Sequence, residues 1–236
     1  MFGIAKDIRS EVRVCTLDLL NAALDSPHVA RICAEIEDAL EKCRRGEITK
    51  DEYETIKGEL KKKLPIFTFH ATFKNGRRKN DDAVPSGLSI YDLDHIENPR
   101  AKWDSMKERA SELGIVLAYI SPSLEGLRLV FVMPQGMSLA EAQAWMASQL
   151  GNEQYDACVK DFARCSFVVP REYVLFLDED ALFSSPTALS FRAEQSEAKN
   201  LGNTKVVVNV DATEIFRTES STTRLPPFGR LNDNGC

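Results

Sequence analysis

The chain has 236 residues, of which 43% are hydrophobic and 28% charged, so it can form one sizeable core and does not belong to the disordered class. Its net charge of −6 excludes a protein coated with basic residues, such as a nonspecific DNA-packaging protein, although local basic patches can still bind nucleic acid. The sequence has no apolar run of about 18 residues, no secretory leader and no Cys-x-x-Cys pair among its six cysteines, which predicts a soluble, cytoplasmic protein with reduced thiols and no membrane contact.

The N-terminal region, residues 1–64, is expected to be helical. Apolar residues recur at spacings of three and four positions over residues 29–43, which is typical of a helix with one buried face. Thr49 and Glu52 then form a capping-box pattern at the start of a second helix that reaches Leu64. We therefore predict two antiparallel helices. Their apolar stripes favour packing on the rest of the chain over recruitment of a partner.

Two basic stretches follow. Residues 61–63 are three lysines at the predicted end of the second helix, where positive charge is favourable; contact with a DNA backbone is the alternative. The segment Lys74-Asn75-Gly76-Arg77-Arg78-Lys79 comes after three phenylalanines. Base stacking on aromatic rings and phosphate contacts from Lys74, Arg77 and Arg78 would suit a nucleic-acid strand. Because Asn-Gly also favours a tight turn, a solvated hairpin loop is the other interpretation, and such loops can carry binding residues.

Two aspartates, Asp92 and Asp94, end an apolar run that begins at residue 87. On a strand, which rises about 3.3 Å per residue, their side chains share one face roughly 6.6 Å apart, while Tyr91 and Leu93 point the other way. Two such carboxylates suit Mg²⁺ or Mn²⁺, which often join protein carboxylates to substrate phosphates in phosphoryl or nucleotidyl transfer. Asp-x-Asp is also common in surface turns and caps, so the pair needs support from elsewhere in the chain.

That support comes from a predicted β-hairpin. Two apolar runs, residues 115–120 and 127–132, flank a Ser-Pro-Ser-Leu-Glu-Gly link with the composition of a turn. Arg128 is the charged exception in the second run and needs an anionic partner or solvent. Further along, Asp161 and Arg164 precede another apolar run.

Helices and strands alternate over residues 65–177. One helix is predicted from Asn98-Pro99 through Leu113, and another begins at the Ser138/Glu141 capping pattern. Because the link at residues 121–126 is too short for a crossover between parallel strands, we predict an α+β fold with a mixed or antiparallel sheet. We expect three parts: the helical N-terminal region, residues 1–64; a core, residues 65–185; and a C-terminal extension or linker, residues 186–236, with a possible strand at residues 206–210.

In the order of these motifs the chain resembles the archaeo-eukaryotic primase superfamily. Within it, the chain is most similar to the primase-polymerase-like domain at the N terminus of VirE-type proteins of bacterial mobile elements. Asp92 and Asp94 match the acidic motif, Ser121-Pro122-Ser123 with Arg128 matches the Ser-containing turn and basic strand residue, and Asp161 matches the third acid. The likeness covers about residues 64–178. Arg128 is a departure, since many members carry histidine there.

The resemblance implies an RRM-like primase core and a metal-dependent nucleotidyltransferase. Such an enzyme would be a DNA primase or polymerase of a mobile genetic element, acting on a single-stranded DNA template by a two-metal mechanism. The catalytic, metal-binding residues would be Asp92, Asp94 and Asp161, holding Mg²⁺ or Mn²⁺. The residues that bind the NTP or dNTP would be Ser121, Ser123, Arg128 and Arg164. For Arg164, an ordinary salt bridge to Asp161 is the alternative. The resemblance also implies a helicase-like ATPase domain or partner.

Two other functions compete with this one. A primase-like module that binds nucleotide or single-stranded DNA without turnover would account for Arg128 in place of histidine and for the acidic net charge. An unrelated Asp-x-Asp phosphotransferase of the haloacid-dehalogenase type is disfavoured, because Ile96 stands where threonine or valine is usual.

Overall fold

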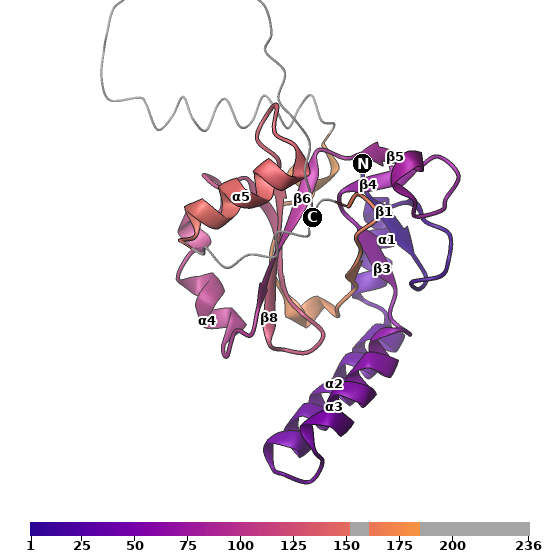
Figure 1. Ribbon diagram of the computed structural model, residues 1–236, viewed down its shortest axis with the longest axis vertical. Helices are drawn as coiled ribbons and strands as arrows, with labels where there is room; N and C mark the ends of the chain where they lie inside the picture. Colours follow the sequence, from indigo (N-terminus) through magenta and orange to yellow (C-terminus); the bar gives the residue numbers. More distant parts are fainter. Residues whose placement is uncertain (152–160, 185–236) are drawn as a thin grey trace, which may run out of the picture. The chain divides into compact units, whose positions relative to one another are not determined.

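The computed structural model describes residues 1–151 and 161–184, which form an α+β fold with antiparallel sheets, as predicted (Figure 1). What we call the N-terminal sheet has the strand order β2 (Arg13–Val14), β1 (Gly3–Ala5), β3 (Ile66–Thr68), β9 (Ser166–Phe167). What we call the central sheet has the order β10 (Val174–Leu177), β7 (Ile115–Ile120), β8 (Gly126–Val132), β6 (Leu88–Asp94). A separate two-stranded hairpin joins β4 (Ala71–Phe73) and β5 (Ala83–Pro85).

The two faces of the central sheet enter different hydrophobic cores, because side chains alternate along each strand. On one face, Leu88, Ile90 and Val130 pack together with residues of the N-terminal sheet. On the other face, Tyr91 and Leu93 pack in a second core with residues of two helices. These helices are α4 (Pro99–Asp104) and α5 (Leu139–Gln149). Figure 1 shows them on one side of β6 and β8, with β1 and β3 on the other side.

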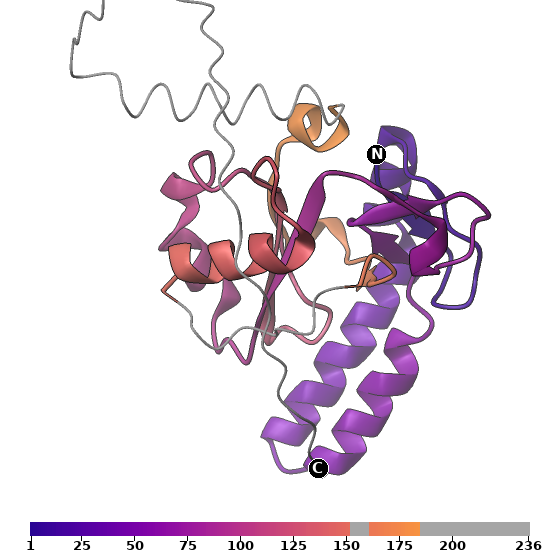
Figure 2. The same ribbon diagram turned by 45° about the horizontal axis from the view of Figure 1, so that its top comes forward.

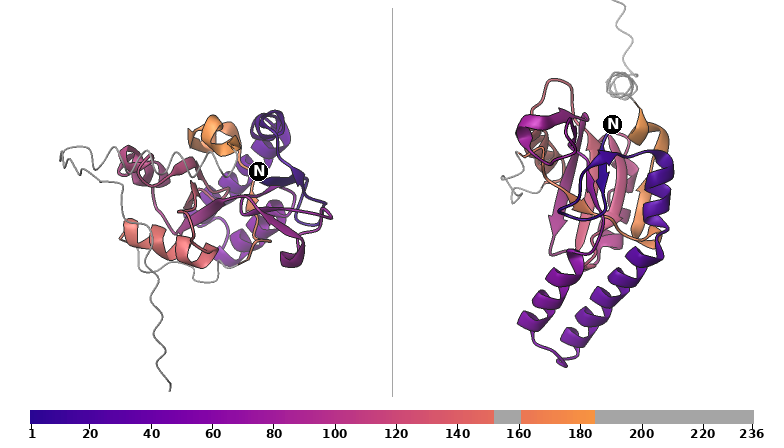
Figure 3. Two further views of the ribbon diagram at one scale, coloured as in Figure 1. Left: turned by 90° about the horizontal axis from the view of Figure 1, so that it is seen from above. Right: turned by 90° about the vertical axis from the view of Figure 1, so that its right-hand side faces the viewer.

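A helical hairpin of α2 (Pro27–Arg44) and α3 (Lys50–Lys61) confirms the two antiparallel helices expected from the sequence (Figures 2 and 3). Near its outer end, Leu40 and Tyr53 form a small core, and Leu124 from the turn between β7 and β8 packs against it. The turn of the central sheet is thereby held against the helices.

Both predicted capping boxes are present. Thr49 accepts a hydrogen bond from the backbone N–H of Glu52, whose side chain accepts one from the backbone N–H of Thr49, at the start of α3. Ser138 and Glu141 make the same pair of bonds at the start of α5. Each box satisfies backbone donors that have no partner inside the helix.

The structure differs from the sequence expectation in two places. The N-terminal region contains, besides its helices, the strands β1 and β2, and β1 pairs with β3 of the core. The helix predicted through Leu113 is wrong in length: α4 ends at Asp104, and a short 3₁₀ turn, η2 (Lys107–Arg109), follows. The Ser105 hydroxyl donates to the Lys102 carbonyl oxygen at 2.7 Å, a local bond that competes with helix continuation.

Four further elements are described. They are α1 (Leu17–Leu24), η1 (Asn80–Asp82), η3 (Arg171–Tyr173) and α6 (Glu179–Phe183). Of these, α1, η3 and α6 contribute buried residues to the core that the two sheets share. Cys15 and Cys33 are buried free thiols, and Cys43 and Cys165 are half-buried free thiols. None of the helices in residues 1–151 and 161–184 combines the length and the hydropathy needed for a transmembrane span. The C-terminal extension and the possible strand at residues 206–210 lie outside the described residues.

Candidate functional site

Three of the residues singled out in the sequence meet where β6 pairs with β8. The antiparallel register places Asp92 opposite Arg128 and Asp94 opposite Gly126. Residues that stand opposite one another in such a pair have Cβ atoms about 4.5–5.5 Å apart and project from the same face of the sheet. This is the face that looks toward the N-terminal sheet.

Two arginines form ion pairs with these two carboxylates and compensate their negative charge. Arg128 Nε lies 3.0 Å from Asp92 Oδ1, and Arg128 Nη2 lies 2.9 Å from Asp94 Oδ1. Arg164, from the segment before β9, places its Nη2 at 2.6 Å from Asp92 Oδ2. We call these four residues the acid–arginine cluster. It joins a strand pair of the central sheet to a segment that continues into the N-terminal sheet.

Burial within the cluster is uneven, and this decides which ion pair matters for the fold. The side chain of Asp92 is 12% exposed and that of Arg128 is 16% exposed, whereas Asp94 is 60% exposed. Burial lowers the pKa of the Arg128 guanidinium, but the nearby charges of Asp92 and Asp94 outweigh that effect, so the net shift of the pKa is upward. Arg128 therefore stays cationic, and its pair with Asp92 is the shielded part of the cluster.

A glycine makes room for the Arg128 side chain. A Cβ atom at Gly126 would lie 3.1 Å from Arg128 Nη1 and 2.9 Å from Ser121 Oγ, both closer than side chains tolerate easily. Arg128 Nη1 is buried and has no hydrogen-bond partner among the described residues. Gly126 thus leaves the space that the guanidinium and the Ser121 hydroxyl occupy.

The predicted nucleotide-binding serines lie in the turn next to this guanidinium. Ser121 and Ser123 are 2% and 9% exposed, and their hydroxyl oxygens are 3.1 Å apart. The backbone N–H of Ser121 donates to the Gly126 carbonyl oxygen, and the Ser121 carbonyl accepts from Leu124 N–H. Both hydroxyls are therefore beside the cluster but turned into the protein.

Asp161, the third predicted acid, organises the loop that carries Arg164. Its Oδ1 accepts a hydrogen bond from the backbone N–H of Ala163 at 2.7 Å. The opposite side of the loop is held by Arg78, which donates to the carbonyl oxygens of Ala163 and Ile8 at 3.1 and 2.7 Å. In the described part of the chain, no three His, Cys, Asp or Glu side chains are arranged to hold a metal ion.

The other two predicted nucleic-acid contacts are surface residues. Lys74 and Arg77 are exposed on the segment that links β4 to β5, which is a hairpin loop as the Asn-Gly turn indicated. Arg78, their neighbour, is half-buried by its two carbonyl contacts. Of the three predicted nucleic-acid contacts, Arg78 therefore supports the fold, and Lys74 and Arg77 are cations on the surface.

His70 is a positioning residue whose role the sequence did not reveal. It is 1% exposed, its Nε2 accepts the backbone N–H of Ile90 at 3.2 Å, and its Nδ1 lies 3.1 Å from the Asp161 carbonyl oxygen. Since Nε2 accepts, Nδ1 must carry the proton and donate. Burial lowers the pKa of this imidazole, which keeps it neutral. His70 thus fixes the loop of Asp161 relative to β6.

A second side-chain contact joins the central sheet to the N-terminal sheet beside the cluster. Tyr119 stands opposite Arg128 in the pairing of β7 with β8, and its hydroxyl lies 2.6 Å from Ser166 Oγ on β9. Burial raises the pKa of Tyr119, so the phenol stays neutral. Sequence reasoning missed both residues, because a tyrosine in an apolar strand resembles any other core residue.

Comparison with known proteins gives one family. The model of the BT4734-like N-terminal domain matches residues 59–183, more than half of the chain. The matched stretch runs from the end of α3 to the end of α6 and contains the whole acid–arginine cluster. The chain has no match among curated proteins or solved structures.

Proposed function

The chain belongs to the family of the BT4734-like N-terminal domain, and for this core we propose the function of a metal-dependent nucleotidyltransferase, a DNA primase or polymerase of a mobile genetic element. The observation that carries the proposal is the convergence of two carboxylates and two guanidiniums on one face of the central sheet. Carboxylates suit a divalent cation, and guanidiniums suit a triphosphate. The order of motifs that resembles the primase superfamily supports the reaction class and an RRM-like core.

Two carboxylates of the cluster have the chemistry to bind Mg²⁺ or Mn²⁺. Asp92 and Asp94 would hold the cation, because Mg²⁺ commonly binds one or two protein carboxylates and completes its coordination with water and substrate phosphates. When bound, the cation would supply positive charge at the reacting phosphate. Asp161 stays a candidate third ligand, while its observed contact is with Ala163.

The chain's own residues would exchange partners when substrate binds. Arg128 and Arg164 would turn from the aspartates to the phosphates of the NTP or dNTP, and the released carboxylates would face the cation. Every charge then keeps a partner. Either ligand alone would leave a shielded charge without compensation, which is costly. The proposal therefore implies that metal and nucleotide bind together far better than separately.

A second candidate is a primase-like module that binds nucleotide or single-stranded DNA without turnover. The engaged side chain of Asp161 favours it, because the described residues then present two carboxylates where the two-metal mechanism uses three. Arg128 in the place of a histidine favours it as well. The arginines would still bind phosphate in such a module.

The test is nucleotide incorporation on a single-stranded DNA template with Mg²⁺ or Mn²⁺, with and without a primer. The native chain is compared with Asp92→Asn and Asp94→Asn, and nucleotide binding is measured alongside. Metal-dependent products that both variants lose support the transferase, and products without a primer make it a primase. Binding without products, also after addition of a helicase-like ATPase partner, supports the binding module. If neither products nor nucleotide binding is observed, both proposals are contradicted.

A further inference from the structure

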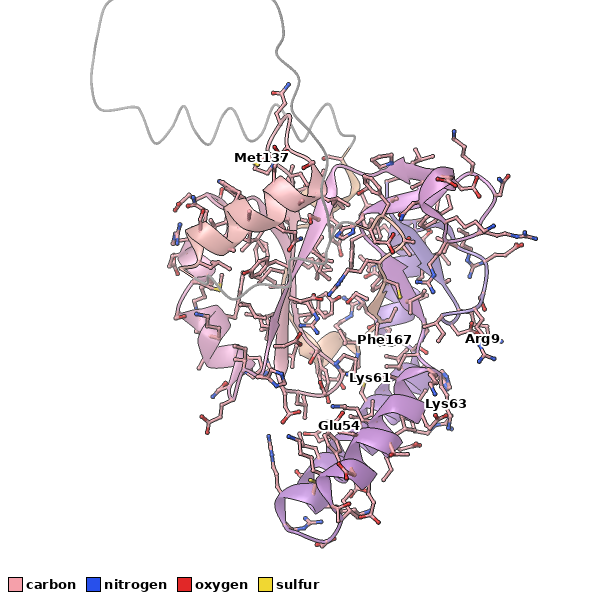
Figure 4. The ribbon with its side chains drawn as sticks, in the orientation of Figure 1. Arg9, Glu54, Lys61, Lys63, Met137 and Phe167 are labelled. Carbon is pink, nitrogen blue, oxygen red and sulfur yellow. The ribbon has the colours of Figure 1, made fainter. Side chains whose placement is uncertain are left out.

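Two loops lie against each other beside the N-terminal sheet. The β1–β2 loop, residues 6–12, and the β4–β5 loop, residues 74–82, are joined through the backbone, since Val12 N–H donates to the Gly76 carbonyl oxygen at 2.7 Å. A Cβ atom at Gly76 would lie only 3.4 Å from the Cβ atom of Glu11. Figure 4 shows Arg9 projecting outward from the first of these loops. The two loops therefore form one continuous surface.

This surface adjoins the segment that carries Arg164. Arg78, in the β4–β5 loop, donates to the carbonyl oxygens of Ile8 and Ala163 at 2.7 and 3.1 Å. It therefore ties the β1–β2 loop and the β4–β5 loop to the residue that precedes Arg164. Because Arg164 in turn pairs with Asp92 at 2.6 Å, the surface is connected to the acid–arginine cluster through two successive residues.

Positive charge dominates this surface. The two loops together with Arg13 of β2 contain seven lysines and arginines and four acids, in a chain whose net charge is −6. One of the acids, Asp7, accepts the backbone N–H groups of Arg9 and Ser10, both at 2.8 Å, and so stabilises its own loop. Six of the seven cations are exposed, and within the described ranges none of these six forms an ion pair. We call them the basic surface: Lys6, Arg9, Arg13, Lys74, Arg77 and Lys79.

The basic surface suits the phosphates of a nucleic acid and not its bases. Stacking of bases on Phe67, Phe69 and Phe73 was expected from the sequence and is wrong, because these side chains are 2%, 1% and 7% exposed and pack in hydrophobic cores. Residues 6–13 and 74–82 contain no aromatic residue. Binding through cations alone depends steeply on salt and little on base sequence.

We propose that the basic surface binds the phosphate backbone of a single-stranded DNA template next to the acid–arginine cluster. The inference rests on the proposed function, because its partner is the template of that reaction. To the contacts predicted from the sequence, Lys74 and Arg77, it adds the cations of the β1–β2 loop and β2. Arg78 holds the two loops together instead of contacting DNA. The first residues of the chain, which lie outside the predicted core, thereby become part of the template site.

The test measures binding of fluorescently labelled oligo-dT by fluorescence anisotropy at several salt concentrations. The first variant combines Lys6→Gln, Arg9→Gln and Arg13→Gln in one chain. Each phosphate contact to a single strand contributes about 0.7 to the slope of log affinity against log salt concentration, so losing three contacts should reduce the slope by about 2. The affinity at low salt should fall at least about tenfold. Native affinity with a native salt slope would overturn the inference.

A matched variant controls for net charge. Arg44→Gln, Arg45→Gln and Lys50→Gln together remove the same three positive charges at the outer end of the helical hairpin, where all three residues are exposed. We expect this variant to keep the affinity and the salt slope of the native chain. Equal weakening by both variants would mean that the DNA responds only to the overall charge of the protein, and the inference would be wrong.

Thermal unfolding and nucleotide binding separate a binding role from a structural one. The first variant changes only exposed residues, so it should unfold at nearly the temperature of the native chain. It should also bind dATP with Mg²⁺ as the native chain does, because the acid–arginine cluster is unchanged. A lower unfolding temperature with loss of both dATP and oligo-dT would mean a structural role and overturn the inference.

The remaining outcomes distinguish this inference from the proposed function. If the native chain incorporates nucleotides and the first variant binds oligo-dT normally, the inference is wrong and the proposed function stands. If oligo-dT binding depends on the basic surface but the native chain neither binds nor incorporates nucleotides, the DNA-binding surface is supported and the proposed transferase fails. If the native chain does not bind oligo-dT, the inference is wrong.

Discussion

Arg128 and Asp92 stand directly opposite each other in the pairing of β8 with β6, and Arg128 Nε lies 3.0 Å from Asp92 Oδ1. Arg164 holds the other oxygen of the same carboxylate. Asp92, which we propose as a metal ligand, is therefore held by two of the chain's own cations. The protein must exchange these contacts to bind a ligand there.

The two aspartates should differ in their importance for the fold. Asp92→Asn removes the shielded negative charge between two guanidiniums and should lower the free energy of unfolding by about 2–4 kcal/mol. Asp94→Asn affects a largely exposed carboxylate and should cost less than about 1 kcal/mol. Urea denaturation of both variants measures the difference. Equal losses in the free energy of unfolding would contradict the prediction that the more buried ion pair contributes more to stability.

Metal and nucleotide should depend on each other for binding. We expect weak binding of Mg²⁺ alone and of dATP alone, and binding at least about tenfold tighter when both are present, because only then does every charge of the cluster keep a partner. Calorimetric titration of dATP at several Mg²⁺ concentrations measures this coupling. Tight Mg²⁺ binding to the nucleotide-free protein would show that the arginines do not hold the carboxylates in solution.

Gly126→Ala should disturb the site through Arg128. The added Cβ would meet Arg128 Nη1, Ser121 Oγ and the Leu93 carbonyl oxygen at 3.1, 2.9 and 3.2 Å, and the carbonyl cannot rotate away. We expect a loss of about 1–3 kcal/mol in the free energy of unfolding and weaker nucleotide binding.

Gly58→Ala is the matched control for this substitution. Gly58 lies within α3, and a Cβ there would meet nothing within 4 Å. Alanine favours the helix, so stability should rise by up to about 1 kcal/mol and nucleotide binding should stay unchanged. An equally stable Gly126→Ala variant would show that the turn adapts without moving the guanidinium.

Stability should fall in mild acid because of His70. Burial lowers the pKa of His70 in the folded protein from its ordinary value of 6.5, so in the unfolded chain the imidazole takes up its proton at higher pH. The unfolded state therefore binds more protons as the pH falls below about 6.5, and stability is lost in that direction. Urea denaturation of the native chain and of His70→Gln at pH 7.5 and 5.5 tests this. The variant should be less stable at both pH values but lose less between them.

The patterns formed by neighbouring residues were sufficient to predict several local elements, among them both capping boxes and the hairpin of the central sheet. The capping boxes at Thr49 and Ser138 depend on residues three positions apart, and the hairpin around residues 121–126 depends on a short turn, so both are readable from adjacent sequence. Strand alternation likewise indicated that Asp92 shares a face with Asp94. In each case the physical cause acts over a few residues.

Which charges meet across the fold was decided only by the tertiary structure. Arg164 is separated from Asp92 by 72 positions, and His70 is separated from Asp161 by 91, so neither contact leaves a local pattern in the sequence. The strands β1 and β2 were missed for the same reason, since strands of three and two residues are stabilised by their partners rather than by their own composition. The sequence by itself supplied the charged groups, and the packing of the two sheets determined their partners, because ion pairs and buried hydrogen bonds depend on distance in space.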